Sequence, residues 1–151
     1  MSYTLQILPT NPEAAWYYKT AERNNDNAGF DLYVTDDVIF GPDEKKLVSM
    51  NVKATVTNIH DKKVHYWMLP RSSLSKTGLM LCNSVGVIDR TYRGELMAFL
   101  WNTKSEPVSV LKGSRLVQIV APDMGWIHHV EVVHELDSTE RGEGGFGSTG
   151  R

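Results

Sequence analysis

The stretch KLVSMNVKATVTN, residues 46–58, decides the fold class of this 151-residue chain. Within it Val52, Ala54 and Val56 alternate with polar residues. A period of two places every second side chain on the same face of a β-strand, with the apolar face turned to a core. We therefore predict a half-buried strand here.

Outward from this stretch, short apolar or alternating segments recur between Gly, Pro, Asn and Asp, and few keep a helical period. Many short strands at this spacing favour a sandwich or a jelly roll. Two segments look helical: PEAAWYYKT, which Pro12 can open, and SSLSKTG, where Ser72 or Ser73 caps one or two turns that end at Gly78. The other predicted strands cover residues 3–8, 29–34, 37–40, 64–69, 94–102, 107–112, 115–122 and 128–136.

The composition predicts a single soluble domain. With 16 basic and 18 acidic residues the net charge is −2, which argues against a broad phosphate-binding surface and so against a nucleic-acid partner. One cysteine excludes an internal disulfide, and the flanking LMLC predicts that Cys82 fills the core. No leader pattern and no apolar run of about 20 residues is present. We expect an intracellular protein without membrane contact, cytoplasmic or, in a eukaryotic host, nuclear.

The C-terminal stretch RGEGGFGSTG, residues 141–150, satisfies the spacing G-x-G-x-x-G. A dinucleotide loop needs a following helix and an acidic partner about 20 positions later, and here too few residues follow. A plain flexible end is one alternative. The other is a lid on an aromatic, phosphorylated ligand, because Arg141 offers a planar fork, Phe146 a stacking face, and Ser148 and Thr149 hydroxyls.

Polar side chains in three apolar or helical stretches need an explanation. Asp31, within AGFDLYV, needs a cation or hydrogen-bond donors, and both an ion pair and a functional role stay open. In LPRSSLSKTG, Arg71, Ser72 and Ser73 lie at the start of a helical turn, which suits an anion or is simply a capped turn. Gln118 lies in an apolar strand and must find hydrogen-bond partners.

The stretch CNSVGVIDRTYRGELM, residues 82–97, looks like two strands joined by a tight bend around Arg90 and Thr91. Asp89 and Tyr92 lie beside that bend. Turn chemistry alone can account for Asp89, so the stretch by itself leaves its role open.

Taken in order, AGFDLYV, PRSSLSKTG, NSVGVIDRTYRGEL, GSRLVQIV and RGEGGFGSTG resemble the five motifs of the trimeric dUTP diphosphatases (dUTPases), from about residue 28 to the end. The resemblance implies an all-β fold, a distorted β-barrel or jelly roll, assembled as a homotrimer with shared active sites. It implies a barrel domain over residues 1–136 and a flexible Gly-rich arm over residues 137–151 that closes a neighbouring chain's site. The implied reaction is the Mg²⁺-dependent hydrolysis of dUTP to dUMP and pyrophosphate.

The resemblance also implies residue roles. Asp89 would activate a water for attack on the α-phosphorus, Tyr92 would pack on the deoxyribose, and Asp31 would belong to the outer shell of the metal. The groups expected to read the uracil edge are Asn83, Gly86, Val87, Ile88 and Met97. The groups expected on the phosphates and in the arm are Arg71, Ser72, Ser73, Gln118, Arg141, Phe146, Gly147, Ser148 and Thr149, with Phe146 over uracil.

Two alternatives remain. One is a dCTP deaminase, which shares the fold, although the C-terminal stretch 141–150 matches the dUTPase motif and so argues against a deaminase. A nucleotide-responsive binding protein on the same scaffold is the other. Residues 11–27 have no predicted role.

Overall fold

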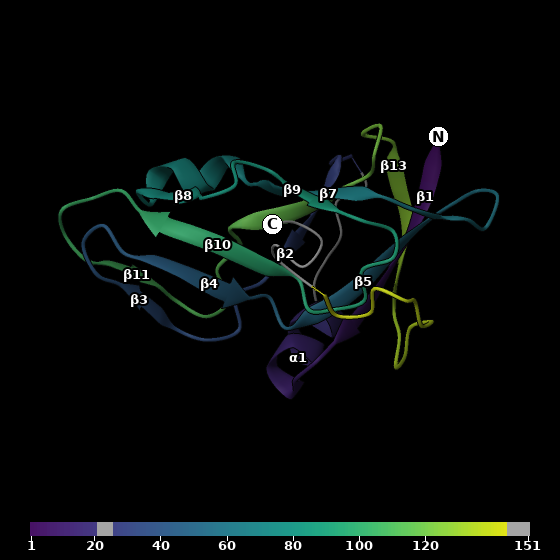
Figure 1. The fold of residues 1–151 in the computed structure, drawn as a ribbon, viewed down its shortest axis with the longest axis horizontal. Helices are drawn as coiled ribbons and strands as arrows, with labels where there is room; N and C mark the ends of the chain where they lie inside the picture. Colours follow the sequence, from purple (N-terminus) through teal and green to yellow (C-terminus); the bar gives the residue numbers. More distant parts are fainter. Residues whose placement is uncertain (21–25, 145–151) are drawn as a thin grey trace.

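The structure, a computed structural model, describes residues 1–20 and 26–144. Strands dominate it, with one α-helix and one short 3₁₀-helix (Figure 1). The elements in chain order are β1 (Ser2–Pro9), α1 (Pro12–Thr20), β2 (Gly29–Leu32), β3 (Val38–Phe40), β4 (Lys45–Ser49), β5 (Val52–Asn58), β6 (Lys63–Val64), β7 (Tyr66–Pro70), η1 (Ser72–Lys76), β8 (Leu79–Leu81), β9 (Gly86–Ile88), β10 (Met97–Asn102), β11 (Val108–Val110), β12 (Val117–Val120) and β13 (Trp126–Val132).

Within residues 1–20 and 26–144 the strands form four sheets, with the orders β13-β1-β5-β6, β4-β10-β8, β11-β3 and β2-β12-β7-β9. In Figure 1 the sheets around β10 and β11 occupy one end of the molecule and β1, β5 and β13 the other. Strand β1 pairs parallel with β13 and antiparallel with β5. Strand β9 lies at the edge of its sheet, paired on one side with β7.

The predicted β class is confirmed, and so is the helix over residues 12–20. The segment 46–58 is two strands rather than one, because Asn51 has a φ of 53°, a left-handed backbone that ends β4 and redirects the chain into β5. Strand β8, Leu79–Leu81, was not predicted.

The predicted serine cap of the second helix is wrong. The 3₁₀-helix η1 begins at Ser72 itself, and Arg71 takes the capping position with extended backbone and no capping hydrogen bond from its side chain. Gly78 follows with a φ of 85°, as expected for a chain that leaves a helical turn.

Aliphatic side chains from every sheet meet in one core. Leu5 and Ile7 of β1, Val52 of β5 and Leu100 of β10 are fully buried. Cys82 does not join them: it is exposed in the turn after β8, so the predicted core position is wrong. Its apolar neighbours in sequence mark the strand Leu79–Leu81, which ends one residue earlier.

Helix α1 covers one end of this core. Asn11 caps it, because its side chain accepts a hydrogen bond from the Ala14 amide at 2.8 Å, and Pro12 takes the first helical position. Ala14 and Tyr18 are buried, and the Tyr18 hydroxyl accepts the Tyr33 amide at 2.9 Å. The helix is therefore part of the fold.

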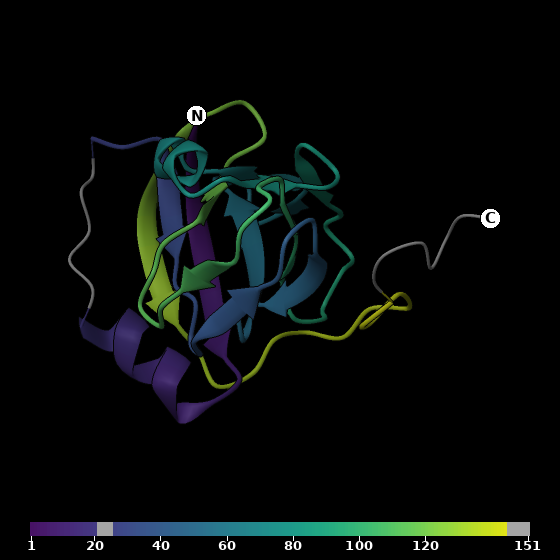
Figure 2. The same ribbon diagram turned by 90° about the vertical axis from the view of Figure 1, so that its left-hand side faces the viewer.

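After β13 the chain leaves the sheets and runs along one side of the molecule (Figure 2). Among the described residues, no helix combines the length and the apolar character needed to cross a membrane.

Candidate active site

Strand β9 presents a free backbone edge. It pairs with β7 through Tyr66↔Ile88 and Met68↔Gly86, and no strand covers its other side among the described residues. The backbone of Gly86 comes so close to β7 that a Cβ would lie 3.2 Å from the Met68 carbonyl oxygen. An exposed strand edge offers N–H and C=O groups in a row, which suits the polar edge of a planar base.

Asp89 follows this strand directly and is half-exposed. Its carboxylate forms an ion pair with the Arg141 guanidinium and lies 3.8 Å from Nδ1 of His65. That nitrogen accepts the Arg90 amide at 2.9 Å, so it carries no proton to share with Asp89. Arg141 is therefore the cationic group on this carboxylate.

Tyr92 lies flat against the chain that follows it. Its hydroxyl donates to the Glu95 carbonyl oxygen at 2.5 Å, and a Cβ on Gly94 would lie 2.5 Å from that hydroxyl. Arg141 lies over the ring at 5.4 Å from its centroid. Burial raises the pKa of Tyr92, and the nearby Arg141 charge partly opposes this. The Tyr92 side chain is thus uncharged and held in one position by its neighbours.

A second cluster lies where β2, β12 and β7 meet. Nε of Arg71 lies 2.8 Å from one oxygen of Asp31, and Nη1 of Arg115 lies 3.5 Å from the other. Arg71 also donates to Ser73 Oγ at 3.3 Å, and Gln118 donates to the Pro70 carbonyl oxygen at 3.2 Å. Two guanidinium groups and the start of η1 form a cationic corner suited to phosphate.

Asp31 holds the two arginines of this corner. The structural ion pair that its sequence context left open is therefore present. The absence of a side chain at Gly29 makes room for the Gln118 side chain, because a Cβ at position 29 would lie 1.9 Å from the Gln118 side-chain oxygen.

In one chain the two clusters are far apart. His65 and Asp89 mark one end of β7, whereas Arg71 directly follows its other end. At about 3.3 Å per residue, the six steps from His65 to Arg71 span about 20 Å. The chain thus brings Asp89, Tyr92 and Arg141 together, and separately Asp31, Arg71, Ser73 and Gln118, but does not unite the two groups.

The remaining predicted residues lie as follows. Asn83 is exposed in the turn before β9, Val87 is exposed on β9, and Met97 begins β10 half-buried. Ser72 begins η1. The predictions for Phe146, Gly147, Ser148 and Thr149 lie outside the described residues.

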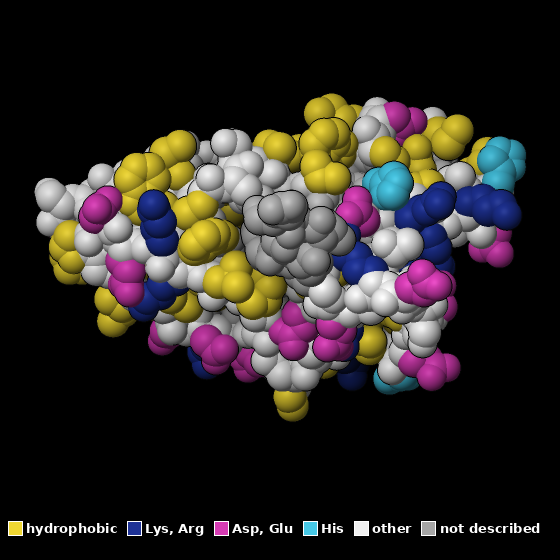
Figure 3. All heavy atoms as spheres, viewed as in Figure 1, with side chains coloured by type: hydrophobic (Ala, Val, Ile, Leu, Met, Phe, Trp, Pro, Cys, Tyr) yellow, Lys and Arg dark blue, Asp and Glu magenta, His cyan; other side chains and the backbone are white. Residues whose placement is uncertain are grey.

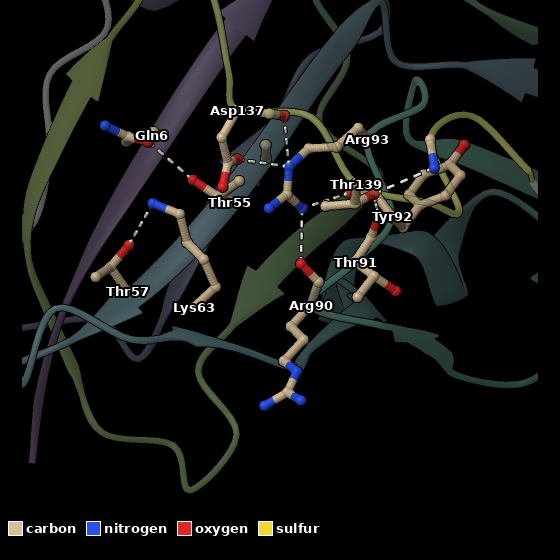
Figure 4. Close-up of polar contacts among 12 residues, drawn as sticks. Gln6, Thr55, Thr57, Lys63, Arg90, Thr91, Tyr92, Arg93, Asp137 and Thr139 are labelled. Atoms are coloured by element: carbon tan, nitrogen blue, oxygen red, sulfur yellow. Dashed lines mark hydrogen bonds and ion pairs between the residues drawn. The ribbon is translucent and has the colours of Figure 1, made fainter.

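Sequence reasoning missed Arg93, which joins the arm to the loop after β9 (Figure 4). Its buried side chain donates to Asp137 and to the Arg90 carbonyl oxygen. An arginine beside a turn looks solvated in sequence, and its partner Asp137 lies 44 positions away. Only the fold brings the two together.

The sequence model of the dUTPase family matches residues 19–150. The chain belongs to the dUTPase family. A deoxyuridine 5'-triphosphate nucleotidohydrolase of Nautilia profundicola is 38% identical, over 97% of this chain and 99% of that protein. One of Clostridium kluyveri is 39% identical, over 82% and 84%.

Solved dUTPase structures share the fold. A Staphylococcus bacteriophage 80alpha dUTPase mutant with dUpNHpp has a TM-score of 0.64 at 25% identity, over 98% of this chain and 99% of that one. The Streptococcus mutans dUTPase has a TM-score of 0.57 at 31% identity, over 66% and 80%. The family resemblance is thus confirmed.

Proposed function

We propose that this chain hydrolyses dUTP to dUMP and pyrophosphate. The observation that carries the proposal is the group formed by Asp89, Tyr92 and Arg141 at the end of the edge strand β9, within a dUTPase-family chain. The relatives named above are nucleotidohydrolases of the same substrate.

Asp89 supplies the base. Its half-exposed carboxylate is open to water, so it holds one and accepts its proton as the water attacks the α-phosphorus. Arg141, already on this carboxylate, moves to the phosphates when dUTP enters, since the triphosphate carries more negative charge. The negative charge that develops on the phosphate oxygens during the reaction is then stabilised by the positioned Arg141 guanidinium.

The free edge of β9 reads the base. Backbone groups of Gly86, Val87 and Ile88, with the Asn83 side chain, pair with the polar edge of uracil, while Met97 closes the pocket. Tyr92 packs on the deoxyribose and leaves no room for a 2'-hydroxyl, because Gly94 beneath it lets the ring lie close to the backbone. A steric wall of this kind discriminates strongly.

Arg71, Ser72, Ser73 and Gln118 bind the phosphates of the same nucleotide. Because this corner lies about 20 Å from Asp89 along β7, the second cluster comes from another chain. We therefore propose a homotrimer with shared sites. The half-exposed apolar face of the β4-β10-β8 sheet supports it; Figure 3 shows hydrophobic side chains gathered over β4 and β10.

Mg²⁺ fits this site as an ion carried by the triphosphate. Among the described residues no group of three His, Cys, Asp or Glu side chains forms a metal cage, and Mg²⁺ commonly binds through phosphates and waters. Asp31 is engaged by two arginines, so its outer-shell role rests on the family resemblance alone. When bound, Mg²⁺ neutralises charge on the phosphates and the leaving group.

Replacing Asp89 tests the function. Asp89→Asn keeps the shape but loses the base, so pyrophosphate release from dUTP should fall by at least about 100-fold while nucleotide binding, followed by calorimetry, survives. Asp61→Asn, in the turn between β5 and β6, is the control and should hydrolyse dUTP normally. Normal turnover in Asp89→Asn would refute the proposal.

The deaminase alternative has a direct test. Incubation with dCTP should release no ammonia, and ammonia release in place of pyrophosphate release from dUTP would favour the dCTP deaminase. For a nucleotide-responsive binding protein, dUTP would bind without turnover.

A further inference from the structure

His65 lies where the chain passes from one sheet to another. It follows β6 and precedes β7, and β7 pairs antiparallel with the edge strand β9 through Tyr66↔Ile88. One further step of this register places His65 opposite Asp89. The His65 side chain is 60% exposed, so contacts with the neighbouring turn, rather than burial, hold the ring.

The neighbouring turn, residues 89–92, carries Asp89 at its first position. The Tyr92 amide donates to the Asp89 carbonyl oxygen at 3.0 Å, a bond that closes the turn and leaves the Arg90 amide without a partner inside it. Nδ1 of His65 accepts this amide at 2.9 Å. The Arg90 carbonyl oxygen accepts Nη1 of Arg93 at 2.7 Å (Figure 4). The backbone that carries Asp89 is thus held on both sides of Arg90.

The bond to the Arg90 amide requires a neutral imidazole. A ring nitrogen that accepts a hydrogen bond carries no proton, so the proton of His65 is on Nε2. In a protonated ring both nitrogens are donors, and Nδ1 would face the Arg90 amide donor to donor. Protonation would therefore break the contact that holds the turn.

An acceptor for the protonated ring lies close by. The charged side chains near the ring are those of Asp89, Arg90 and, two residues earlier in the chain, Lys63. The Asp89 carboxylate lies 3.8 Å from Nδ1 and also pairs with Arg141, whereas the Lys63 ammonium donates to a β5 hydroxyl at 3.1 Å. Among the residues that the structure describes, Asp89 is thus the acidic side chain that an imidazolium here would engage.

We propose that His65 is a positioning residue whose neutral ring holds the turn 89–92 through the Arg90 amide, and whose protonation releases this turn and occupies Asp89. The kinetic consequence rests on the proposed dUTP hydrolysis, but the hydrogen bond and its loss on protonation are independent of it. His65 touches no reacting atom; it acts on Asp89 through the backbone of Arg90.

The first test needs no nucleotide. In isotope-labelled full-length protein, the Arg90 amide resonance should shift as the pH falls from about 8 to 5.5, because imidazole changes charge in this range. His65→Ala should speed exchange of this amide about three- to tenfold, the range for one lost hydrogen bond. His65→Asn keeps an oxygen acceptor on the same Cβ–Cγ stem and does not titrate, so it should retain the slow exchange and lose the pH-dependent shift.

The second test measures kcat and KM for dUTP over the same pH range. At about pH 8, His65→Ala should lose about three- to tenfold in kcat and His65→Asn should recover most of it. Between about pH 8 and 5.5, wild-type kcat should fall at least about threefold further than that of His65→Asn. Titration of the substrate is the same for both proteins, so the comparison removes it.

His60→Asn, at an exposed histidine on the turn between β5 and β6, is the matched control and should keep the wild-type pH profile. An Arg90 resonance that did not titrate would overturn the hydrogen-bond role. Identical kinetic pH profiles for wild type and His65→Asn would overturn the effect on Asp89. If wild-type protein failed to hydrolyse dUTP, the proposed function would fail, while the Arg90 resonance would still decide whether His65 holds the turn.

Discussion

At the scale of single residues, Tyr92 and Gly94 act as a pair. The ring can approach the backbone only because position 94 has no Cβ. In the structure, which holds no nucleotide, Arg141 lies over the ring at 5.4 Å from its centroid.

Gly94→Ala should displace this ring. The added Cβ would lie 2.5 Å from the Tyr92 hydroxyl, so we expect a stability loss of about 1–3 kcal/mol and weaker rejection of UTP relative to dUTP. The measurement is the ratio of kcat/KM for the two nucleotides, beside thermal unfolding.

Gly41→Ala is the matched control, because the nearest atom to its Cβ lies at 3.6 Å. It should leave the ratio unchanged. A Gly94→Ala enzyme that rejected UTP as well as wild type would contradict the role of the ring.

Individual residues also show what a local motif can and cannot reveal. Asp89 and Tyr92 are singled out because they lie three positions apart in one short motif, and the structure places both against Arg141; their roles in the reaction stay predictions. Arg93 was missed because its burial depends on a segment far along the chain, and no local pattern encodes that.

At the scale of elements, β1 is an interior strand of its sheet, with β13 on one side and β5 on the other. Ile7 on this strand is fully buried. Ile7→Ala should therefore cost about 2–5 kcal/mol of unfolding free energy, through lost burial and the cavity left behind. Urea unfolding measures it, and Ile7→Val should cost less, about 0.5–1.5 kcal/mol. Equal costs would imply that the site collapses around the smaller residue.

The arm should respond to acid. The Arg93 hydrogen bond holds the pKa of Asp137 below its usual range, with burial opposing. A depressed folded-state pKa stabilises the docked arm above the unfolded value of about 3.9 and loses this contribution as the pH falls through the folded value. Because Asp137 is 55% exposed, solvent screening keeps the effect under about 1 kcal/mol.

The measurement compares wild type with Asp137→Asn between pH 3 and 7. The difference in their unfolding midpoints should be largest near neutrality and shrink below about pH 4. A difference that grew toward acid pH would contradict the direction of the shift.

Elements were largely predictable where their period was clear. The helix over residues 12–20 and the strands around Val56 and Ile119 follow their patterns. The break at Asn51 was not predictable, because apolar and polar residues alternate on both sides of it. Only the left-handed backbone of Asn51 separates β4 from β5, which lie in different sheets.

At the scale of the whole molecule, one chain holds two separated polar clusters, which we propose are the two halves of a shared site. The apolar face that we propose as the trimer contact includes Leu47, which is 48% exposed, and Met80, which is 55% exposed. Leu47→Lys should lower the assembly state seen by light scattering, and dUTP turnover should fall with it.

Ile59→Lys is the control, because Ile59 is an apolar residue with 63% exposure on the turn between β5 and β6, and it should leave the assembly intact. Full turnover by a monomeric Leu47→Lys protein would contradict the shared site. Assembly could not be derived from strand patterns, because they specify which side chains are buried within a chain and not which faces meet between chains.

The edge strand β9 has a consequence for mutational tolerance. If uracil is read by the main chain, then the side chain at the exposed position Val87 contributes little to base choice and can vary freely. Only changes that remove an amide hydrogen or bend the strand, such as proline, would alter it. Selectivity for uracil would then tolerate most single substitutions in β9, the strand whose backbone recognises the base.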